Sequence, residues 1–164
     1  MSLPSVNLVR HNTALLFFAV SIACTQSTAP FEVNLRPVPD IATLNTNAGF
    51  SSFSFDAMLV NRTTSPVTAG LCGAALQRLE SEKWVTVYSP VCGGGPSLTW
   101  RAGPNDSVSI PVKVVDSPDH QAVFGAKARI VPGQYRLILL VNRGNDTRSA
   151  DTHLVTSPAF TVRD

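Results

Sequence analysis

Three cysteines, Cys24, Cys72 and Cys92, carry the most distinctive chemistry in this chain of 164 residues. Disulfide bonds use cysteines in pairs, so an odd number leaves one sulfur for a different purpose. A thiol can also carry a lipid, ligate a metal or act as a nucleophile. Which of the three stands apart depends on the segments that surround them.

Other residue types that support catalysis or metal binding are present, but not in recognisable patterns. Asp116, Asp119 and His120 could offer two carboxylates and an imidazole to a cation, yet aspartates beside a proline are also usual turn residues. His153 lies beside another polar loop, and Gly93–Gly95 lacks the lysine of a phosphate-binding loop. The sequence has neither closely spaced zinc ligands nor a Gly-x-Ser-x-Gly elbow. It therefore predicts no enzyme, no metal site and no cofactor.

The composition excludes two broad classes of protein. Lysine and arginine number 13, aspartate and glutamate 11, and hydrophobic residues make up 44% of the chain. A disordered chain needs lower hydrophobicity and a higher net charge. A nucleic-acid-binding protein needs a surplus of positive charge, which is missing here. The length fits one folded domain, and 12 prolines with 10 glycines favour short elements joined by turns.

The N-terminal segment has the organisation of an export signal. Polar residues with Arg10 and His11 precede an apolar run at 14–22, which is interrupted only by Ser21. A transmembrane helix needs about 20 apolar residues, whereas a signal-peptide core needs roughly 7–15. Residues 1–23 are therefore predicted to be a cleavable signal peptide.

The segment Ser21-Ile22-Ala23-Cys24 resembles the lipobox of bacterial lipoproteins, in which the cysteine becomes the lipid-modified first residue of the mature protein. Ala23 and Cys24 match that pattern, whereas Ser21 and Ile22 depart from it. Ser21 and Ala23 would also suit an ordinary signal peptidase, and both cleavage modes cut before Cys24. The resemblance implies a lipid on Cys24 and a short tether at 24–30. It also implies export and anchoring to a membrane of the bacterial cell envelope, in the periplasm or at the cell surface.

Cys72 and Cys92 remain as an even pair once Cys24 is assigned to the lipid. An exported protein meets an oxidising compartment, where paired cysteines form disulfides by default. A bond between them would stabilise the fold by about 3 kcal/mol in the chain-entropy model. Two free thiols are the alternative, because the distance between the sulfurs cannot be read from a sequence.

From Phe31 onward the hydrophobic pattern has a period of two, which is typical of β-strands, and turn residues separate the runs. The predicted strands cover approximately 31–37, 51–61, 70–79, 83–89, 97–101, 107–115, 127–131, 134–142 and 153–163. The predicted core residues are Val33, Phe53, Phe55, Leu59, Leu71, Trp84, Val108, Ile110, Val112, Tyr135, Leu137, Leu139, Phe160 and Val162.

This pattern predicts an all-β fold, an antiparallel β-sandwich of about seven to nine strands that occupies residues 31–164 as one domain. Pro111 interrupts one strand pattern. Because proline cannot donate a hydrogen bond within a sheet, that strand is expected at an edge or at a bulge.

Several motifs resemble those of bacterial immunoglobulin-like domains, namely Asn61-x-Thr63 after an early strand, Trp84-Val85-x-Val87 in a hairpin and Pro132-Gly133-x-Tyr135 before a late strand. The resemblance implies an immunoglobulin-like sandwich with structural roles for Trp84, Pro132, Gly133 and Tyr135. A tyrosine at the start of a strand can bury its ring and hydrogen-bond a nearby backbone group, which is the tyrosine-corner arrangement. An ordinary core tyrosine is the alternative.

Asn61, Asn105 and Asn145 each begin an Asn-x-Ser/Thr sequon. Such sequons are glycosylation sites in a secreted eukaryotic protein. In a bacterium they are turn residues, and all three lie where turns are predicted.

Together these features predict a non-enzymatic exported domain that acts as a binding or structural accessory of the cell envelope. Its partners would be the membrane, through the lipid anchor, and another protein, with no nucleic acid and no small-molecule substrate expected. Binding would use the 143–151 loop, the 116–121 loop, or the outward Ile138 and Leu140. Alternatively, the strand of Ile138 and Leu140 is central and has both faces buried.

A proteinase inhibitor is the second functional hypothesis. Small bacterial inhibitors of the β-sandwich type are similar in strand spacing and in a late Pro-Gly-x-Tyr strand. The loop at 92–96, braced by the disulfide, would then occupy a protease cleft. An enzyme or metal protein that uses His120 or His153 is the third.

Overall fold

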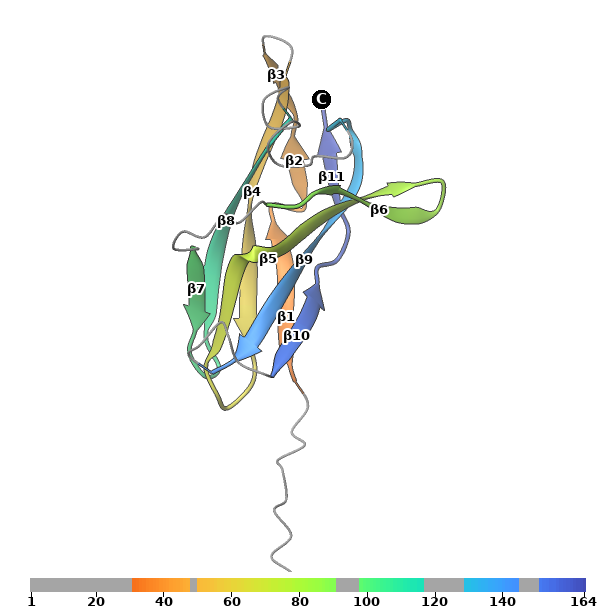
Figure 1. Cartoon of the computed structure of the whole chain (residues 1–164). Coiled ribbons are helices and arrows are strands. Elements are labelled where there is room, and N and C mark those ends of the chain that lie inside the picture. Colours follow the sequence, from red (N-terminus) through yellow and green to blue (C-terminus); the bar gives the residue numbers. More distant parts are fainter. Residues whose placement is uncertain (1–30, 48–49, 91–97, 117–128, 145–150) are drawn as a thin grey trace, which may run out of the picture.

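A computed structural model of the chain describes residues 31–47, 50–90, 98–116, 129–144 and 151–164. These residues form eleven β-strands and no helix, and the strands make two sheets that face each other (Figure 1). The all-β prediction is confirmed, with more strands than the seven to nine expected. β1 begins at one end of the sandwich, and the C-terminus lies at the other (Figure 1). Within these ranges, no helix is long and apolar enough to cross a membrane.

The first sheet consists of β1 (Val33–Val38), β3 (Asn45–Asn47), β4 (Phe50–Asn61) and β8 (Ser107–Asp116). β4 is the central strand and pairs antiparallel with the other three. Its ladder with β8 runs without interruption over ten residue pairs. β8 has no second neighbour among the described strands. Pro111 therefore lies on an edge strand, as its missing N–H predicts.

The second sheet holds the other seven strands in the order β2-β11-β9-β5-β6, with β10 also beside β9 and β7 also beside β5. They are β2 (Ile41–Thr43), β5 (Val67–Glu80), β6 (Lys83–Tyr88), β7 (Thr99–Ala102), β9 (Gly133–Arg143), β10 (Thr152–Thr156) and β11 (Phe160–Arg163). β2 and β11 are parallel, and the other neighbours are antiparallel. The β5–β6 hairpin projects from the body (Figure 1), and its tip residues Ser81 and Glu82 have the positive φ angles that a two-residue hairpin turn needs.

The ladder between β5 and β9 is interrupted where β5 changes partners from β7 to β6. Ala69 pairs with Val141 and Ala74 with Leu139, so the segment Gly70–Gly73 bulges opposite a single residue, Leu140. A Cβ atom on Gly73 would lie 2.6 Å from the Cβ atom of Leu140. The bulge therefore needs glycine at this position, since any side chain would displace the neighbouring strand.

The core lies between the sheets and is made by inward-facing residues of both. Four aromatic rings, those of Phe53, Phe55, Tyr135 and Phe160, cluster within it, with centroid separations from 4.6 to 6.4 Å. Most of the predicted core residues are buried. The inward set of each strand was therefore predictable from its period of two.

Three predicted core residues are not fully buried. Leu71 and Val108 pack against the core with partial exposure, and Trp84 is half-buried outside it. Alternation shows which residues of a strand share a face, but not which face meets the other sheet. In β6 the residue that enters the core is Val87.

The strand predictions were wrong in three places. Residues 129–131 form no strand, because the N–H of Ile130 bonds the Asp116 carboxylate instead of a neighbouring strand. The predicted strand 153–163 is two strands separated by Ser157-Pro158, where the Ser157 hydroxyl accepts a hydrogen bond from the backbone of β9. β2 and β3, each three residues long, were not predicted because a strand of three residues shows no period.

Candidate functional site

Several predicted site residues lie outside the described part of the chain. They are Cys24, Cys92 and His120, together with the loop at 92–96 and most of the two polar loops. The lipid anchor, the disulfide and the inhibitor hypothesis therefore stay predictions. Cys72 is described, and its side chain is exposed at the bulge of β5.

His153 belongs to a polar cluster at the end of the sandwich where β1 begins. Its Nε2 atom lies 2.6 Å from Asp151 Oδ1, and Arg143 Nε lies 3.3 Å from the other oxygen of that carboxylate. The Phe31 ring stacks on the imidazole at a centroid distance of 3.7 Å and lies 5.6 Å from the Arg143 guanidinium. Among the described residues, no three His, Cys, Asp or Glu side chains gather as a metal site. The contacts of His153 instead fix Phe31 to β9 and β10, which is a structural role.

Tyr135 is fully buried at the start of β9. Its hydroxyl donates a hydrogen bond to the backbone oxygen of Val131 at 2.5 Å, which is the contact that a tyrosine corner requires. Pro132 and Gly133 lie between these two residues and lead the chain into β9. The geometry of this motif is that of a structural turn.

Arg78 holds the same turn from the neighbouring strand. Its Nη1 donates to the backbone oxygen of Arg129 at 2.6 Å, and its guanidinium pairs with the Glu80 carboxylate. Burial alone would lower the pKa of Arg78, but its interactions with Glu80 and Tyr135 raise that pKa on balance. The side chain therefore stays charged while it ties β5 to the segment that precedes β9.

Asn61 is the last residue of β4, holds the turn that follows, and cannot serve as a glycosylation site in the folded protein. Its side chain is fully buried, and Nδ2 donates to the backbone oxygens of Ser65 and Gly103, each at 2.8 Å. Its Oδ1 accepts hydrogen bonds from the N–H and the hydroxyl of Thr63. A sugar on Nδ2 would break these contacts, so the turn interpretation is favoured for this sequon.

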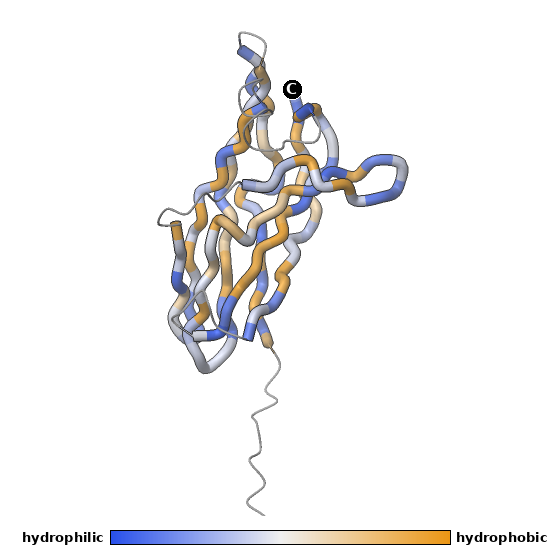
Figure 2. The backbone as a smooth tube through the Cα atoms, in the orientation of Figure 1, coloured by the Kyte–Doolittle hydropathy of each residue, from blue (hydrophilic) through white to orange (hydrophobic). Residues whose placement is uncertain are grey.

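The outer face of the second sheet offers the strongest candidate for a binding surface. Leu154 is 64% exposed and Leu140 is 40% exposed, and the two lie directly opposite each other on β10 and β9. Ile138 continues the row along β9, opposite Ala75 of β5. We call Ala75, Ile138, Leu140 and Leu154 the leucine patch. Figure 2 shows that hydrophobic residues extend along most of β9.

Arginines flank the leucine patch. Arg136 is two residues from Ile138 on the same face of β9, and its guanidinium lies 4.4 Å from the centre of the Trp84 ring. On the other side of the patch, Arg101 of β7 lies opposite Thr68 of β5. No Asp or Glu occupies a described outward position of β5, β6, β7, β9 or β10. The surface is therefore apolar at its centre and positively charged at its sides.

Sequence reasoning identified Ile138 and Leu140 as outward residues but missed their neighbours on the surface. Leu154 and Arg101 come from strands whose pairing no local pattern reveals. Arg136 could have been found, because it shares the parity of Ile138 and Leu140 along one strand. The alternative that both faces of β9 are buried is wrong in the described structure, since Leu140 remains 40% exposed.

Comparison with known proteins finds distant structural similarity. No protein-family model and no curated protein sequence matches the chain. One similar structure is the alkylpurine DNA glycosylase AlkC of Pseudomonas fluorescens bound to DNA containing an abasic site analog, at 13% identity and a TM-score of 0.35. The match covers 83% of this chain and 32% of that one, so this chain spans about a third of the glycosylase.

Two further structures from archaea are similar to a comparable degree. A protein from Archaeoglobus fulgidus has 11% identity and a TM-score of 0.34, over 80% of this chain and 95% of that one. The CARDB domain of a Pyrococcus furiosus protein in complex with di-metal ions has 11% identity and a TM-score of 0.30, over 79% and 89%. Similarities of this size carry no argument about function.

Proposed function

We propose that this protein is an exported, non-enzymatic binding module with an immunoglobulin-like sandwich, anchored to a membrane of the bacterial envelope through a lipid on Cys24. Its leucine patch would dock another protein that presents an apolar surface bordered by acidic residues. The observation that carries the proposal is the exposure of Leu140 and Leu154 side by side on paired strands.

Two adjacent exposed leucines favour a docking role. Single apolar residues are common on protein surfaces, but contiguous apolar patches mark interaction sites. Complete burial of one leucine side chain stabilises an interface by roughly 1.5–3 kcal/mol. The patch lies on strands held on both sides by ladder hydrogen bonds or core packing, so little conformational freedom is lost when a partner covers it.

The charges beside the patch favour an acidic partner. Arg136 and Arg101 face the same way as the leucines, and no carboxylate on the described strands of this face neutralises them. Arginine pairs with carboxylates through two parallel hydrogen bonds, and arginine with tryptophan is a common combination at interface hot spots. Two arginines are too few for a nucleic-acid surface, which needs a continuous stripe of positive charge.

The predicted anchor is compatible with this docking surface. Phe31, the first described residue, is fixed to the sandwich by its stack on His153 at the end where β1 begins. A lipid on Cys24 would therefore hold the domain by that end, while the leucine patch lies on the side of the sandwich formed by β9 and β10 (Figure 1). A partner in the same membrane or in the envelope space would reach it.

We also propose that Cys72 forms its disulfide with Cys92. The described residues on either side of the segment 91–97 both contact the chain near Cys72. The hydroxyl of Ser89 bonds a backbone oxygen two residues after Cys72 at 3.4 Å, and the backbone oxygen of Leu98 accepts from the residue before Cys72 at 3.1 Å. Ser89 and Leu98, which flank the segment that contains Cys92, thus both lie near Cys72, and this supports the pairing.

Membrane fractionation combined with cross-linking tests the proposed function. The wild-type protein is expected in the membrane fraction, and Cys24→Ala in the soluble fraction. A mild cross-linker should join the anchored protein to one partner species. The double variant Leu140→Asp/Leu154→Asp should lose that species, and the matched double variant Ser54→Asp/Ser109→Asp, on the outer face of the first sheet, should keep it. Equal loss in both, or retention in both, would contradict the docking surface.

A further inference from the structure

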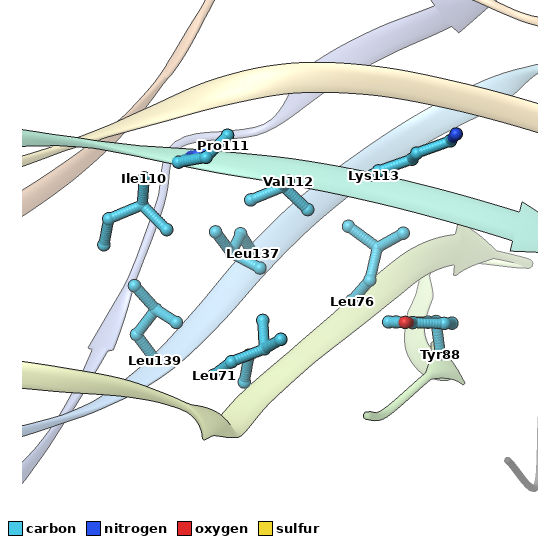
Figure 3. A pocket seen from close by; sticks show the side chains of 10 residues that line it. Leu71, Leu76, Tyr88, Ile110, Pro111, Val112, Lys113, Leu137 and Leu139 are labelled. Atoms are coloured by element: carbon cyan, nitrogen blue, oxygen red, sulfur yellow. The ribbon is translucent and has the colours of Figure 1, made fainter. Parts of the chain in front are cut away.

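A cavity of about 180 Å³ lies between the edge strand β8 and the β5–β9 part of the second sheet. Figure 3 shows side chains of both sheets that converge on it, among them Leu71, Leu76, Val112 and Leu137. The amino group of Lys113 points away from these side chains (Figure 3), so this residue brings no charge into the cavity. The lining is almost entirely aliphatic.

Tyr88 supplies the polar exception. It lies at one end of the cavity (Figure 3), and its hydroxyl makes no hydrogen bond with any described residue. Burial raises the pKa of Tyr88 above its usual value, so the hydroxyl is neutral and able to donate at physiological pH. Since no described residue accepts from this hydroxyl, it can donate to a bound molecule in place of water.

We propose that this cavity is a binding site for a small uncharged molecule that contains one ring and one hydrogen-bond acceptor. A dry, apolar cavity of about 150 Å³ holds a benzene molecule, so this cavity has room for one ring with a short substituent. The Tyr88 hydroxyl would donate to the acceptor. A charged ligand would lose its hydration without finding an opposite charge, so charged ligands are excluded.

The cavity is accessible to such a ligand from the side of β8. Leu71 and Tyr88 are only partly buried, and they mark where the cavity meets solvent. β8 is an edge strand among the described elements, and Pro111 on that strand also lines the cavity. As far as the described strands go, entry of a small molecule beside β8 would therefore not require two paired strands to separate.

This site is independent of the proposed docking function. Ala74 lines the cavity, whereas the next residue, Ala75, belongs to the leucine patch on the opposite face of the same strand. A substitution in the cavity therefore leaves the leucine patch unchanged, and a substitution in the leucine patch leaves the cavity unchanged. The double variant Leu140→Asp/Leu154→Asp should bind a cavity ligand as the wild type does, even where it has lost its protein partner.

Two probes with the same number of non-hydrogen atoms test the proposal. Acetophenone carries a carbonyl oxygen, and isopropylbenzene carries a methyl group in its place. Both are titrated by NMR into the purified Cys24→Ala variant. Both should shift the methyl signals of Leu71, Leu76, Val112 and Leu137. Tyr88→Phe should weaken acetophenone about fivefold, the value of one net hydrogen bond, and leave isopropylbenzene unchanged.

A filled cavity provides the second test. Ala74→Leu should abolish binding of both probes, and the matched variant Ala75→Leu should leave both affinities unchanged. If Ala74→Leu fails to fold, which its circular dichroism will show, the Tyr88→Phe comparison decides alone. The proposal is overturned if neither probe shifts the lining methyl signals at millimolar concentration, or if Tyr88→Phe affects both probes equally.

Discussion

The outer faces of the two sheets differ in their described side chains. On the first sheet the outward residues include charged and polar side chains as well as a few scattered apolar ones; they are Arg36, Asp56, Lys113, Ser54 and Ser109, with the exposed Val38 and the half-buried Met58 and Val60. Both signs of charge are mixed there, as on a surface that stays in water. On the second sheet the leucine patch lies between arginines, with no acidic residue at the described outward positions of the surrounding strands.

The difference between the two outer faces distinguishes residues that the fold needs from residues that only a partner would need. The core is made by inward residues of both sheets, and either outer face could be polar without loss of the core. A row of exposed leucines on one face only is therefore not explained by packing. The proposed docking of a partner on that face would account for both the apolar row and the charges beside it.

The sheets also differ in regularity. The β4–β8 ladder of the first sheet is continuous, whereas the β5–β9 ladder of the second is broken at Gly70–Gly73. Ladder hydrogen bonds are lost at such a bulge, and other contacts must hold it. Cys72 lies in this bulge, so the proposed disulfide would stabilise the second sheet where its ladder is interrupted.

Removal of the disulfide should have the largest effect on stability. Cys72→Ala and Cys92→Ala should each lower the free energy of unfolding by about 3 kcal/mol, because the unfolded chain gains the freedom that the closed loop denied it. Denaturant unfolding with and without a reducing agent measures this. The reducing agent should destabilise the wild type by the same amount and leave both variants unaffected. A wild type indifferent to reduction would show that the bond does not form.

Gly73→Ala should have the next largest effect. The added Cβ atom would lie 2.6 Å from the Cβ atom of Leu140, and the displacement of β9 should lower the free energy of unfolding by about 1–3 kcal/mol. Gly70 is the matched control, because a Cβ atom there would meet nothing within 4 Å. Gly70→Ala should change stability by less than about 0.5 kcal/mol. If Gly70→Ala and Gly73→Ala lowered the free energy of unfolding equally, the close approach of Gly73 to Leu140 would not constrain the position of β9.

A smaller, pH-dependent effect on the free energy of unfolding should come from Tyr88, the last residue of β6. Burial raises the pKa of Tyr88, so the unfolded chain releases this proton at a lower pH than the folded protein does. Stability from this group is fully present below about pH 10 and falls as the pH rises beyond it. Unfolding midpoints measured between pH 8 and 11 should therefore fall less steeply in Tyr88→Phe than in the wild type. Identical slopes would contradict the burial of the hydroxyl.

The smallest stability effect is expected on the leucine patch itself. Leu154→Thr should change the free energy of unfolding by less than about 0.5 kcal/mol, because the side chain is 64% exposed and threonine is well suited to a strand. Thermal unfolding of the isolated protein measures this. A loss of more than about 1.5 kcal/mol would show that Leu154 serves the fold and is not reserved for a partner.

Local patterns predicted the parts of the fold that depend on one strand at a time. The inward residues of β4, β8 and β9 followed from a period of two, and the edge position of Pro111 followed from its missing N–H. The turn before Tyr135 was predicted from four consecutive residues. Each of these features can be predicted without knowing which strands are neighbours.

The candidate surface and the cavity could not be predicted in the same way. Leu154 joins Leu140 only because β10 pairs with β9, and Arg101 joins their face only because β7 pairs with β5. The cavity arises where an edge strand meets the irregular part of β5, and no sequence period encodes that gap. Trp84 shows the same limit, since its position outside the core depends on which face of β6 turns inward.

Photo-crosslinking from single positions in living cells tests the docking surface most directly. A photoreactive amino acid is placed at position 154 on the outer face of the second sheet, and in a parallel strain at position 54 on the outer face of the first. We predict a single cross-linked partner from position 154, reduced by Arg136→Glu, and none from position 54. Equal yields from the two positions, or none from position 154, would contradict the account.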